Sequence, residues 1–332
     1  MKFYSLNQLP LHTDDFFFTY WNDVHVKDTI VVHNPMDSVI VTPVFLRSRK
    51  SLDEHIAYIQ EKCIKRAIVV GNDIQFLKEC PSLEYLKIFP SIDAEGFDFS
   101  PLYELPKIKS LECATMYGLR AMYDVEEPVR TSEIDYSRFP HLRQFIISGA
   151  EGHLNTQKAE TVTNAFFEFG FPKAKSLSGT IPGNMLEVLS IQQAPIESLE
   201  GIEVSHKLRR LDLTYNRRLT DIASLRNLKD TLGYLEIDRC GKIKDFSVLS
   251  ELRNLEFLIL KGSNTLSDVS FLRNMPKLKY LQLDMNVLDG DLRLCEKIPY
   301  VRIKNRKHYS HKDKDMPKDY TEPESLYPFR ID

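Results

Sequence analysis

The chain has 332 residues and a formal net charge of −3, and 42% of its residues are hydrophobic and 27% charged. These values are typical of a folded globular protein and exclude an intrinsically disordered chain. The nearly balanced charge gives no general attraction for nucleic acid or for an anionic membrane. No segment approaches the roughly 20 apolar residues of a membrane span.

The cysteines indicate the compartment. Their number is odd and no two form a C-x-x-C pair, so the sequence predicts neither a disulfide framework nor a zinc site. The first 21 residues contain no uninterrupted apolar run of the kind found in a secretory signal. We therefore expect a cytoplasmic protein with reduced thiols. The five cysteines are Cys63, Cys80, Cys113, Cys240 and Cys295.

Residues 1–63 are expected to form an N-terminal cap. Within them, 24–45 are predicted to form two strands around an Asn-Pro-Met-Asp turn. Leu52, Ile56 and Ile59 then follow helical spacing, which predicts an amphipathic helix in residues 51–64. A β-hairpin followed by a helix would cover the apolar end of the repetitive region that starts at residue 64.

Residues 64–303 repeat a short apolar pattern, L-x-x-L-x-L or a close variant. From Leu189 onward its middle positions lie 22, 24, 23, 23 and 20 residues apart. The alternation places two apolar side chains on one face of a strand. So short a unit cannot bury its own apolar face, and neighbouring units must stack. The pattern starts at Leu83, Ile108, Leu142, Leu186, Leu208, Leu232, Leu255, Leu278 and Ile298, and an earlier strand is expected at 66–70.

A second pattern accompanies the strands: an aspartate, an apolar residue, a variable pair and another apolar residue. We expect each aspartate to accept backbone N–H bonds where a short helical or 3-10 segment begins. The apolar residues that follow would then pack inward. The aspartates are Asp73, Asp98, Asp135, Asp221, Asp245 and Asp268.

Together the two patterns resemble the leucine-rich repeats with units near 22 residues, the subclass of internalins and phosphatase-regulating repeat proteins. Residues 208–303 match best, and 64–191 match with irregularities. The resemblance implies an α/β solenoid: a leucine-rich-repeat horseshoe with a concave parallel β-sheet and short helical or 3-10 segments on its convex side. Cys240 takes the place of the asparagine that bonds the turn backbone in this family. The asparagines at that place are Asn216, Asn264 and Asn286.

One stretch between the repeats is predicted to be helical. In Asn155–Phe171 the residues Val162, Phe166 and Phe169 stand at positions i, i+4 and i+7. An extra partial strand is expected near Leu177. Both assignments fall where the repeat register is difficult to follow.

Two further segments interrupt or end the repeats. Residues 114–134 lengthen one unit and are expected to form an irregular insert. After Ile303 the composition becomes polar and rich in charge, so residues 304–332 are expected to be a C-terminal cap or tail that lies over the last repeat.

Catalytic motifs are absent from the sequence. Gly241-Lys242 has no glycine at P-loop spacing, and neither G-x-S-x-G nor H-E-x-x-H occurs. We expect Cys240 to be a buried structural thiol. The sequence thus predicts no enzyme, no metal site and no cofactor. A metal site is conceivable in the charged tail, where a solvated segment is the favoured interpretation, at His308, His311, Asp313 and Asp315.

Basic clusters raise the question of nucleic acid. Arg209-Arg210, Arg217-Arg218 and the segment 302–312 could contact phosphates. Carboxylates are expected among them on the sheet and would interrupt a continuous basic track, so no nucleic-acid partner is predicted. These carboxylates are Asp212, Glu236, Asp238 and Asp284.

The residues that flank the leucines of each strand are expected on the concave face. The position before the middle leucine is aromatic in four successive repeats, which predicts an exposed row of rings about 15 Å long. Charged residues occupy six of the eight neighbouring positions in these repeats. Exposed aromatic rings beside charges resemble the composition of interface hot spots, although aromatic residues also stabilise strands by stacking alone.

We therefore predict a non-catalytic protein–protein interaction module that binds another protein, with no nucleic acid or membrane as partner. One alternative is a regulatory subunit or an enzyme whose site lies in the 114–134 insert. Another is an antitoxin-like neutralising partner. The predicted contact residues are Tyr234, Phe257, Tyr280, Tyr300, Glu236, Asp238, Lys261, Asp284, Arg302 and Lys304.

Overall fold

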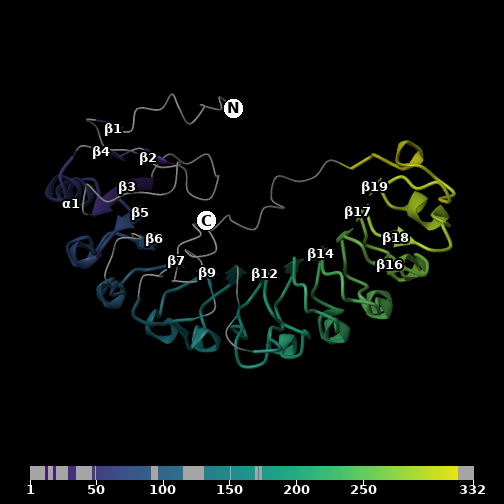
Figure 1. Cartoon of the computed structure of the whole chain (residues 1–332), viewed down its shortest axis with the longest axis horizontal. Helices are drawn as coiled ribbons and strands as arrows, with labels where there is room; N and C mark the ends of the chain where they lie inside the picture. Colours follow the sequence, from purple (N-terminus) through teal and green to yellow (C-terminus); the bar gives the residue numbers. More distant parts are fainter. Residues whose placement is uncertain are drawn as a thin grey trace. The chain divides into compact units, whose positions relative to one another are not determined.

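A computed structural model provides the structure of the protein (Figure 1). It divides into two compact units: Met1–Thr161 with Phe329–Asp332, and Val162–Pro328. The structure describes residues 12–13, 18–19, 29–34, 47–48, 50–90, 96–114, 131–149, 151–168, 171 and 174–320.

The first unit contains a parallel sheet whose strands follow one another in chain order. At its start, β2 (Phe18–Thr19) pairs antiparallel with β3 (Thr29–Asn34). Short parallel pairs join β1 (His12–Thr13) to β4 (Arg47–Ser48), and β8 (Ile134–Asp135) to β10 (His153–Leu154). The parallel strands are β3 (Thr29–Asn34), β5 (Arg66–Gly71), β6 (Tyr85–Pro90), β7 (Ser110–Ala114) and β9 (Gln144–Ser148).

The helix expected in residues 51–64 is present as α1 (Leu52–Glu61). It starts with a capping box, in which Ser51 and Glu54 each accept the other's backbone N–H. Its buried face carries Ile56 and Ile59. Of the hairpin expected at 24–45, β3 is present, and residues 24–28 and 35–45 lie outside the described residues. The role of this region as a cap stays a prediction.

In the second unit the parallel strands pair in one register, so that equivalent positions of successive repeats lie side by side. A small sheet of β16 (Thr265–Leu266) and β18 (Asn286–Val287) joins two of the turns. The main strands are β11 (Asn164–Glu168), β12 (Val188–Gln192), β13 (Arg210–Thr214), β14 (Tyr234–Asp238), β15 (Phe257–Lys261), β17 (Tyr280–Leu283) and β19 (Tyr300–Ile303).

Short 3-10 segments return the chain from one strand to the next. In each unit they lie on the side opposite the strands, called here the return side (Figure 1). The strand expected at 66–70 is present as β5, and a strand is present at each of the nine expected repeats, so both predictions are confirmed. The returning segments are η1 (Gln75–Glu79), η2 (Ser100–Glu104), η3 (Tyr136–Arg138), η4 (Thr156–Lys158), η5 (Ile202–Val204), η6 (Ala223–Leu228), η7 (Ser247–Glu251), η8 (Ser270–Asn274) and η9 (Arg293–Lys297). A further 3-10 segment, η10 (Asp313–Asp315), follows the last strand and contacts it.

The helix expected across Asn155–Phe171 is wrong. This stretch contains η4 and then β11, a further repeat strand. Val162, Ala165 and Phe167 occupy the three positions of the apolar pattern and are fully buried. The strand expected near Leu177 is also wrong, because that residue lies in turns. The small Ala165 hid the repeat, and the spacing of Val162 and Phe166 imitated a helix.

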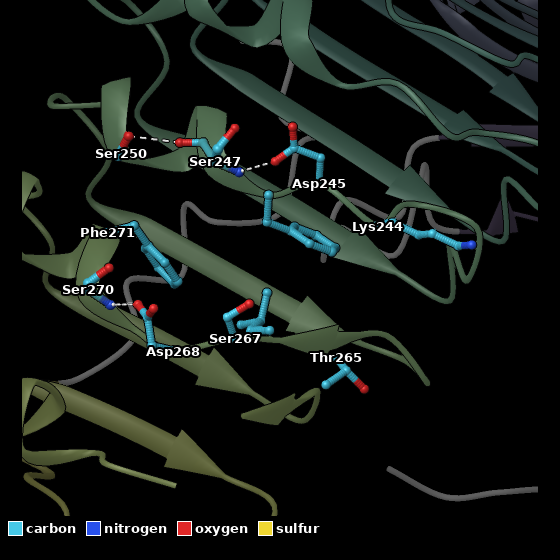
Figure 2. A pocket seen from close by; sticks show the side chains of 11 residues that line it. Lys244, Asp245, Ser247, Ser250, Thr265, Ser267, Asp268, Ser270 and Phe271 are labelled. Carbon is cyan, nitrogen blue, oxygen red and sulfur yellow. Dashed lines mark hydrogen bonds between the residues drawn. The ribbon is translucent and has the colours of Figure 1, made fainter. Parts of the chain in front are cut away.

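The aspartate pattern has the expected role. Asp245 accepts the Ser247 N–H at 2.8 Å and Asp268 accepts the Ser270 N–H at 2.6 Å, where η7 and η8 begin (Figure 2). This bond to the amide two residues ahead fixes the turn into the 3-10 segment. Asp291 makes the same bond, a case the sequence pattern missed because Cys295 stands at its last apolar position. The same bond is made by Asp73, Asp98, Asp135 and Asp221.

Asparagine side chains tie neighbouring turns together inside the second unit. The Asn216 side chain accepts the Ala194 N–H at 2.9 Å and donates to the Ile191 carbonyl at 2.8 Å. Asn264 donates to two carbonyls in the same way, and the Cys240 thiol contacts the Leu213 carbonyl at 3.5 Å. Satisfying these buried backbone groups is a condition for stacking the turns.

Replacing Asn216 tests this role. In Asn216→Ala one buried N–H and one buried carbonyl lose their partners, so we expect a loss of roughly 2–4 kcal/mol in the free energy of unfolding, since each such group costs about 1–3 kcal/mol. Urea denaturation followed by circular dichroism measures it. Asn227→Ala is the control, because Asn227 is exposed and bonds only within its own 3-10 segment. Equal losses in both variants would contradict the assignment.

The turn aspartates predict a dependence of stability on pH. The Ser270 hydroxyl and then its N–H hold the pKa of Asp268 below its ordinary value. A lowered pKa in the folded state stabilises the fold above the unfolded pKa, about 4, and this contribution disappears as the pH falls through the folded value. Asp268→Asn keeps the acceptor oxygen but does not titrate. We expect a shallower loss of stability below pH ~4 in this variant, measured by urea denaturation.

The control is Asp230→Asn, at an exposed aspartate, and its stability should depend on pH as in wild type. If the stability of Asp268→Asn falls with pH as steeply as that of wild type, the effect is refuted.

Candidate functional site

The candidate site is the strand face of the second unit, defined as the side of β13, β14, β15, β17 and β19 that points away from the leucine core. In the observed register Tyr234 pairs with Phe257, Phe257 with Tyr280, and Tyr280 with Tyr300. The row predicted from the sequence is therefore assembled. We call these four residues the aromatic row.

The rings of the aromatic row contact one another along the sheet. Ring centroids lie 6.0 Å apart between Tyr234 and Phe257, and 6.2 Å between Phe257 and Tyr280. Tyr280 and Tyr300 stack at 5.0 Å with planes inclined by only 5°. Such contacts stabilise neighbouring strands in addition to the area they bury.

The expected exposure of the whole row is wrong. Tyr234 is 8% and Tyr280 7% exposed, and both form a buried cluster with Ile259. Phe257 and Tyr300 are only partly buried. The two buried rings are covered because each lies between its neighbours in the row or beneath another side chain.

The two partly buried rings are contacted by the segment after the last strand. Tyr320 packs on Phe257, with ring centroids 5.9 Å apart, and Lys318 lies over the Tyr300 ring at 5.2 Å. The backbone of this segment bonds to the edge of β19: Val301 N–H donates to the Pro317 carbonyl, and Asp319 N–H to the Pro299 carbonyl. Residues of the chain after the repeats thus form part of the strand face.

An arginine covers the other end of the row. The Arg210 guanidinium lies 3.8 Å from the Tyr234 ring centroid, and its Nε is 2.8 Å from the Asp212 carboxylate. Burial raises the pKa of Asp212, and Arg210 opposes that shift only in part. The pair is thus a desolvated acid held against a cation that also stacks on an aromatic ring.

Acids and bases alternate where the strands end, at Asp238, Lys261, Asp284 and Lys304, and two carboxylates, Asp212 and Glu236, lie closer to the rings. The Tyr234 hydroxyl donates to Glu236 at 3.0 Å, and Lys261 contacts the same carboxylate at 2.8 Å. Burial raises the pKa of Asp238, with Glu236 and Asp284 adding to the rise and Lys261 opposing it. Some of these charged side chains thus form ion pairs or hydrogen bonds with one another, as expected of a packed polar surface.

The remaining predicted contact residues lie toward the last strand. Arg302 and Lys304 are exposed, and Asp284 is half-buried and accepts from the Gln282 amide at 3.0 Å. All ten residues predicted from the sequence therefore lie on the strand face or where its strands end. Sequence reasoning missed Arg210, Lys318 and Tyr320 as members of the site. Arg210 stands in the same strand position as the four rings, which is the signal that identifies it.

A hollow of about 360 Å³ lies on the return side between η7 and η8 (Figure 2). Phe246, Leu266 and Phe271 form part of its lining, and the Asp245 and Asp268 carboxylates beside them already bond turn amides. It is a groove between two stacked repeats, so we assign it no ligand.

The side chains considered for a metal site make hydrogen bonds or ion pairs within the fold. Asp313 accepts the Ile303 N–H at 2.8 Å, and the rings of His308 and His311 contact the Val287 carbonyl and Glu296. Within the described part of the chain no group of three or more His, Cys, Asp or Glu residues is placed to hold a metal ion. Burial raises the pKa of the buried thiols, to about 11 for Cys80 and Cys240. A thiol with a raised pKa is a weak nucleophile at neutral pH.

The fold defines a leucine-rich-repeat α/β solenoid of the internalin-like kind. The structure is similar to that of an internalin (inlF) from Listeria monocytogenes, with a TM-score of 0.51 and 17% identity over 89% of this chain and 87% of that one. It also matches internalin C2 (inlC2) of the same organism, with a TM-score of 0.40 and 18% identity over 55% of this chain and 80% of that one. A third match is TLR13, solved as a TLR13–ssRNA13 complex, with a TM-score of 0.36 and 14% identity over 74% of this chain and 47% of that one.

By sequence the chain matches no protein-family model and no curated protein. At these identities the structural likeness establishes the fold alone. That fold is one that proteins typically use for binding other proteins. In the described residues, no helix has the length and apolar character needed to cross a membrane.

The buried acid of the site gives a prediction. In Arg210→Met the Asp212 carboxylate loses its cation, and we expect a loss of roughly 3 kcal/mol in the free energy of unfolding at pH 7. The folded pKa of Asp212 is already raised, so protonation favours the folded state and the variant should regain stability as the pH falls from 7 towards 5. Urea denaturation at several pH values measures both effects.

The matched control is the double variant Arg210→Met/Asp212→Asn, which has no acid to titrate at this place. It should recover part of the stability at pH 7 and show no regain at lower pH beyond that of wild type. A regain of the same size in the double variant would contradict the assignment to Asp212.

Proposed function

We propose that this chain is a non-catalytic protein–protein interaction module and that its partner contacts the strand face of the second unit. The observation that carries the proposal is the aromatic row: four rings on neighbouring strands, in contact and flanked by charged side chains. Aromatic residues bordered by polar and charged groups are characteristic of the energetic centre of protein interfaces.

The burial of two rings divides the row into two roles. Tyr234 and Tyr280 are packed, so in this proposal they form a rigid floor. Phe257 and Tyr300 keep exposed area, and the partner would contact these two rings. A surface held rigid before binding loses little conformational freedom on association, which favours affinity.

The charges around the row would select the partner. Arg302 and Lys304 are exposed beside Tyr300 and suit an acidic group of the partner, whereas the half-buried Asp284 suits a basic one. Exposed charges of this kind contribute more to the orientation and rate of association than to affinity. The ion pair of Lys261 with Glu236 lies on β15 and β14, on the other side of Asp284 from these two cations, and would fix the local geometry.

Stacking for stability alone is the competing interpretation of the row. It accounts for Tyr234 and Tyr280, whose burial needs no partner. It does not account for the exposed area of Phe257, or for the exposed cations Arg302 and Lys304 that follow Tyr300 in the chain. The two interpretations therefore differ in what happens when the exposed members are replaced.

The non-catalytic part of the proposal rests on the chemistry of the described residues. The buried thiols have raised pKa values, and the histidines of the C-terminal segment bond within the fold. The alternative site in the 114–134 insert falls largely on residues 115–130, which lie outside the described residues. The proposal includes a cytoplasmic location, which the free cysteines support. An antitoxin-like neutralising partner would be a special case of the interaction module.

The test uses affinity capture from a lysate of the source cells, read by mass spectrometry. Wild type is compared with Phe257→Glu/Arg302→Glu, which places acids on the exposed part of the strand face. The matched control is Leu288→Glu/Arg253→Glu, because Leu288 is 64% exposed and Arg253 is exposed, both outside this face. Each double variant exchanges one apolar side chain and one arginine for glutamates.

We expect a protein that wild type and the control retain and that Phe257→Glu/Arg302→Glu loses. Circular dichroism and thermal unfolding establish that all three proteins are folded. If the strand-face variant captures the same proteins as wild type, binding through this face is refuted.

A further inference from the structure

A larger hollow lies where the strands of the second unit end. Its volume is about 900 Å³, and the turns that follow β13, β14, β15, β17 and β19 each contribute residues to its lining. The hollow is thus built by five successive repeats. It adjoins the strand face but does not include Phe257, Tyr300 or Arg302.

Cations predominate in the lining. Five basic side chains and two carboxylates, Asp238 and Asp284, face the hollow. Guanidinium groups are well suited to hold phosphate or carboxylate oxygens, because their N–H donors form a planar fork. The basic residues are Arg217, Arg239, Lys261, Lys304 and Arg306.

The two carboxylates neutralise these cations only in part. Asp284 accepts a bond from the neutral Gln282 side chain. Asp238 lies 3.8 Å from the Arg239 Nε, too long for a hydrogen bond, and one of its oxygens is buried without a hydrogen-bond partner. Lys261 is paired with Glu236, outside the lining. Among the described residues no ion pair is recorded for Arg217, Lys304 or Arg306.

Arg306 is the most informative of these residues. Its Nη2 donates to the Asp284 backbone carbonyl at 3.4 Å, which holds the guanidinium against the turn after β17. Its Nε is buried and has no hydrogen-bond partner. An unsatisfied buried donor on this half-buried, positioned arginine calls for an explanation, and a ligand that accepts its N–H would supply one.

We propose that this hollow binds an oxyanion, a phosphate monoester or a carboxylate, carried by a peptide segment. Arg306 and Arg239 would hold the oxyanion, and the exposed Arg217 and Lys304 would attract it. A peptide suits the lining better than a nucleic acid does, because Asp238 and Asp284 interrupt the cations and would repel a continuous run of phosphates. The hollow shares four residues with the predicted contacts of the strand face: Asp238, Lys261, Asp284 and Lys304. Arg239 and Arg306, which would hold the oxyanion, are not among those contacts, so replacing them tests the hollow separately from the strand face.

The test measures the binding of short fluorescein-labelled peptides by fluorescence anisotropy. The peptides are identical except for a central phosphoserine, glutamate or glutamine, which distinguishes a phosphate from a carboxylate source. A labelled single-stranded oligonucleotide is titrated in parallel. The proteins are wild type, Arg239→Gln/Arg306→Gln, the more exposed pair Arg217→Gln/Lys304→Gln, and the control Arg226→Gln/Arg253→Gln outside the hollow.

We expect saturable binding of the phosphoserine peptide, the glutamate peptide or both, and none of the glutamine peptide. Each hollow variant should weaken binding by roughly tenfold or more, the usual scale for loss of charge-assisted bonds, and the control should not. Unchanged thermal unfolding shows that a variant is folded, and the exposed pair provides the answer if Arg306→Gln is unstable.

Three results would overturn the proposal. The first is no saturable binding of either anionic peptide. The second is the same affinity in wild type and in folded hollow variants, or an equal loss in the control. The third is tighter binding of the oligonucleotide than of both peptides, which would assign the hollow to nucleic acid instead.

Discussion

The parallel pairing of successive strands in one register is the constraint on which the rest of the second unit depends. Leu211, Leu235, Leu258 and Leu281 lie side by side and are fully buried. No single repeat could exclude water from these side chains, so each strand obtains its stability from its neighbours. A shift of one residue would turn every leucine outward. The turns satisfy the same constraint, since Tyr215, Arg239 and Gly262 all have positive φ angles just after their strands.

The register also determines the outer surface. Because the side chains alternate, the pairing that stacks leucines inside must stack the intervening residues outside. This is why Tyr234, Phe257, Tyr280 and Tyr300 form one row. At the strand ends it brings five successive turns around one hollow, with cations from three of these turns and from the end of β15. The two candidate binding features are consequences of the same repeat geometry.

How much the sequence can predict follows from this geometry. The period identified the core residues and the strand position of each ring, because both depend only on local alternation. It failed to predict that Tyr234 and Tyr280 are buried, because their cover comes from stacking neighbours and from Arg210. Tyr320 is a further contact of the row, and its segment carries no repeat that would place it. The strand β11 was missed because Ala165 provides little hydrophobic signal, and the hollow because most of its residues lie in turns.

Hydroxyl-radical footprinting of the free protein, read by mass spectrometry, tests the strand register and the surface that it builds most directly. The oxidation rate of each side chain is compared with its rate in the urea-unfolded chain. The structure predicts strong protection of Tyr234 and Tyr280, weaker protection of Phe257 and Tyr300, and little protection of Leu288. Equal protection of all four rings, or oxidation of Tyr234 and Tyr280 at unfolded rates, would contradict the proposed packing of the strand face.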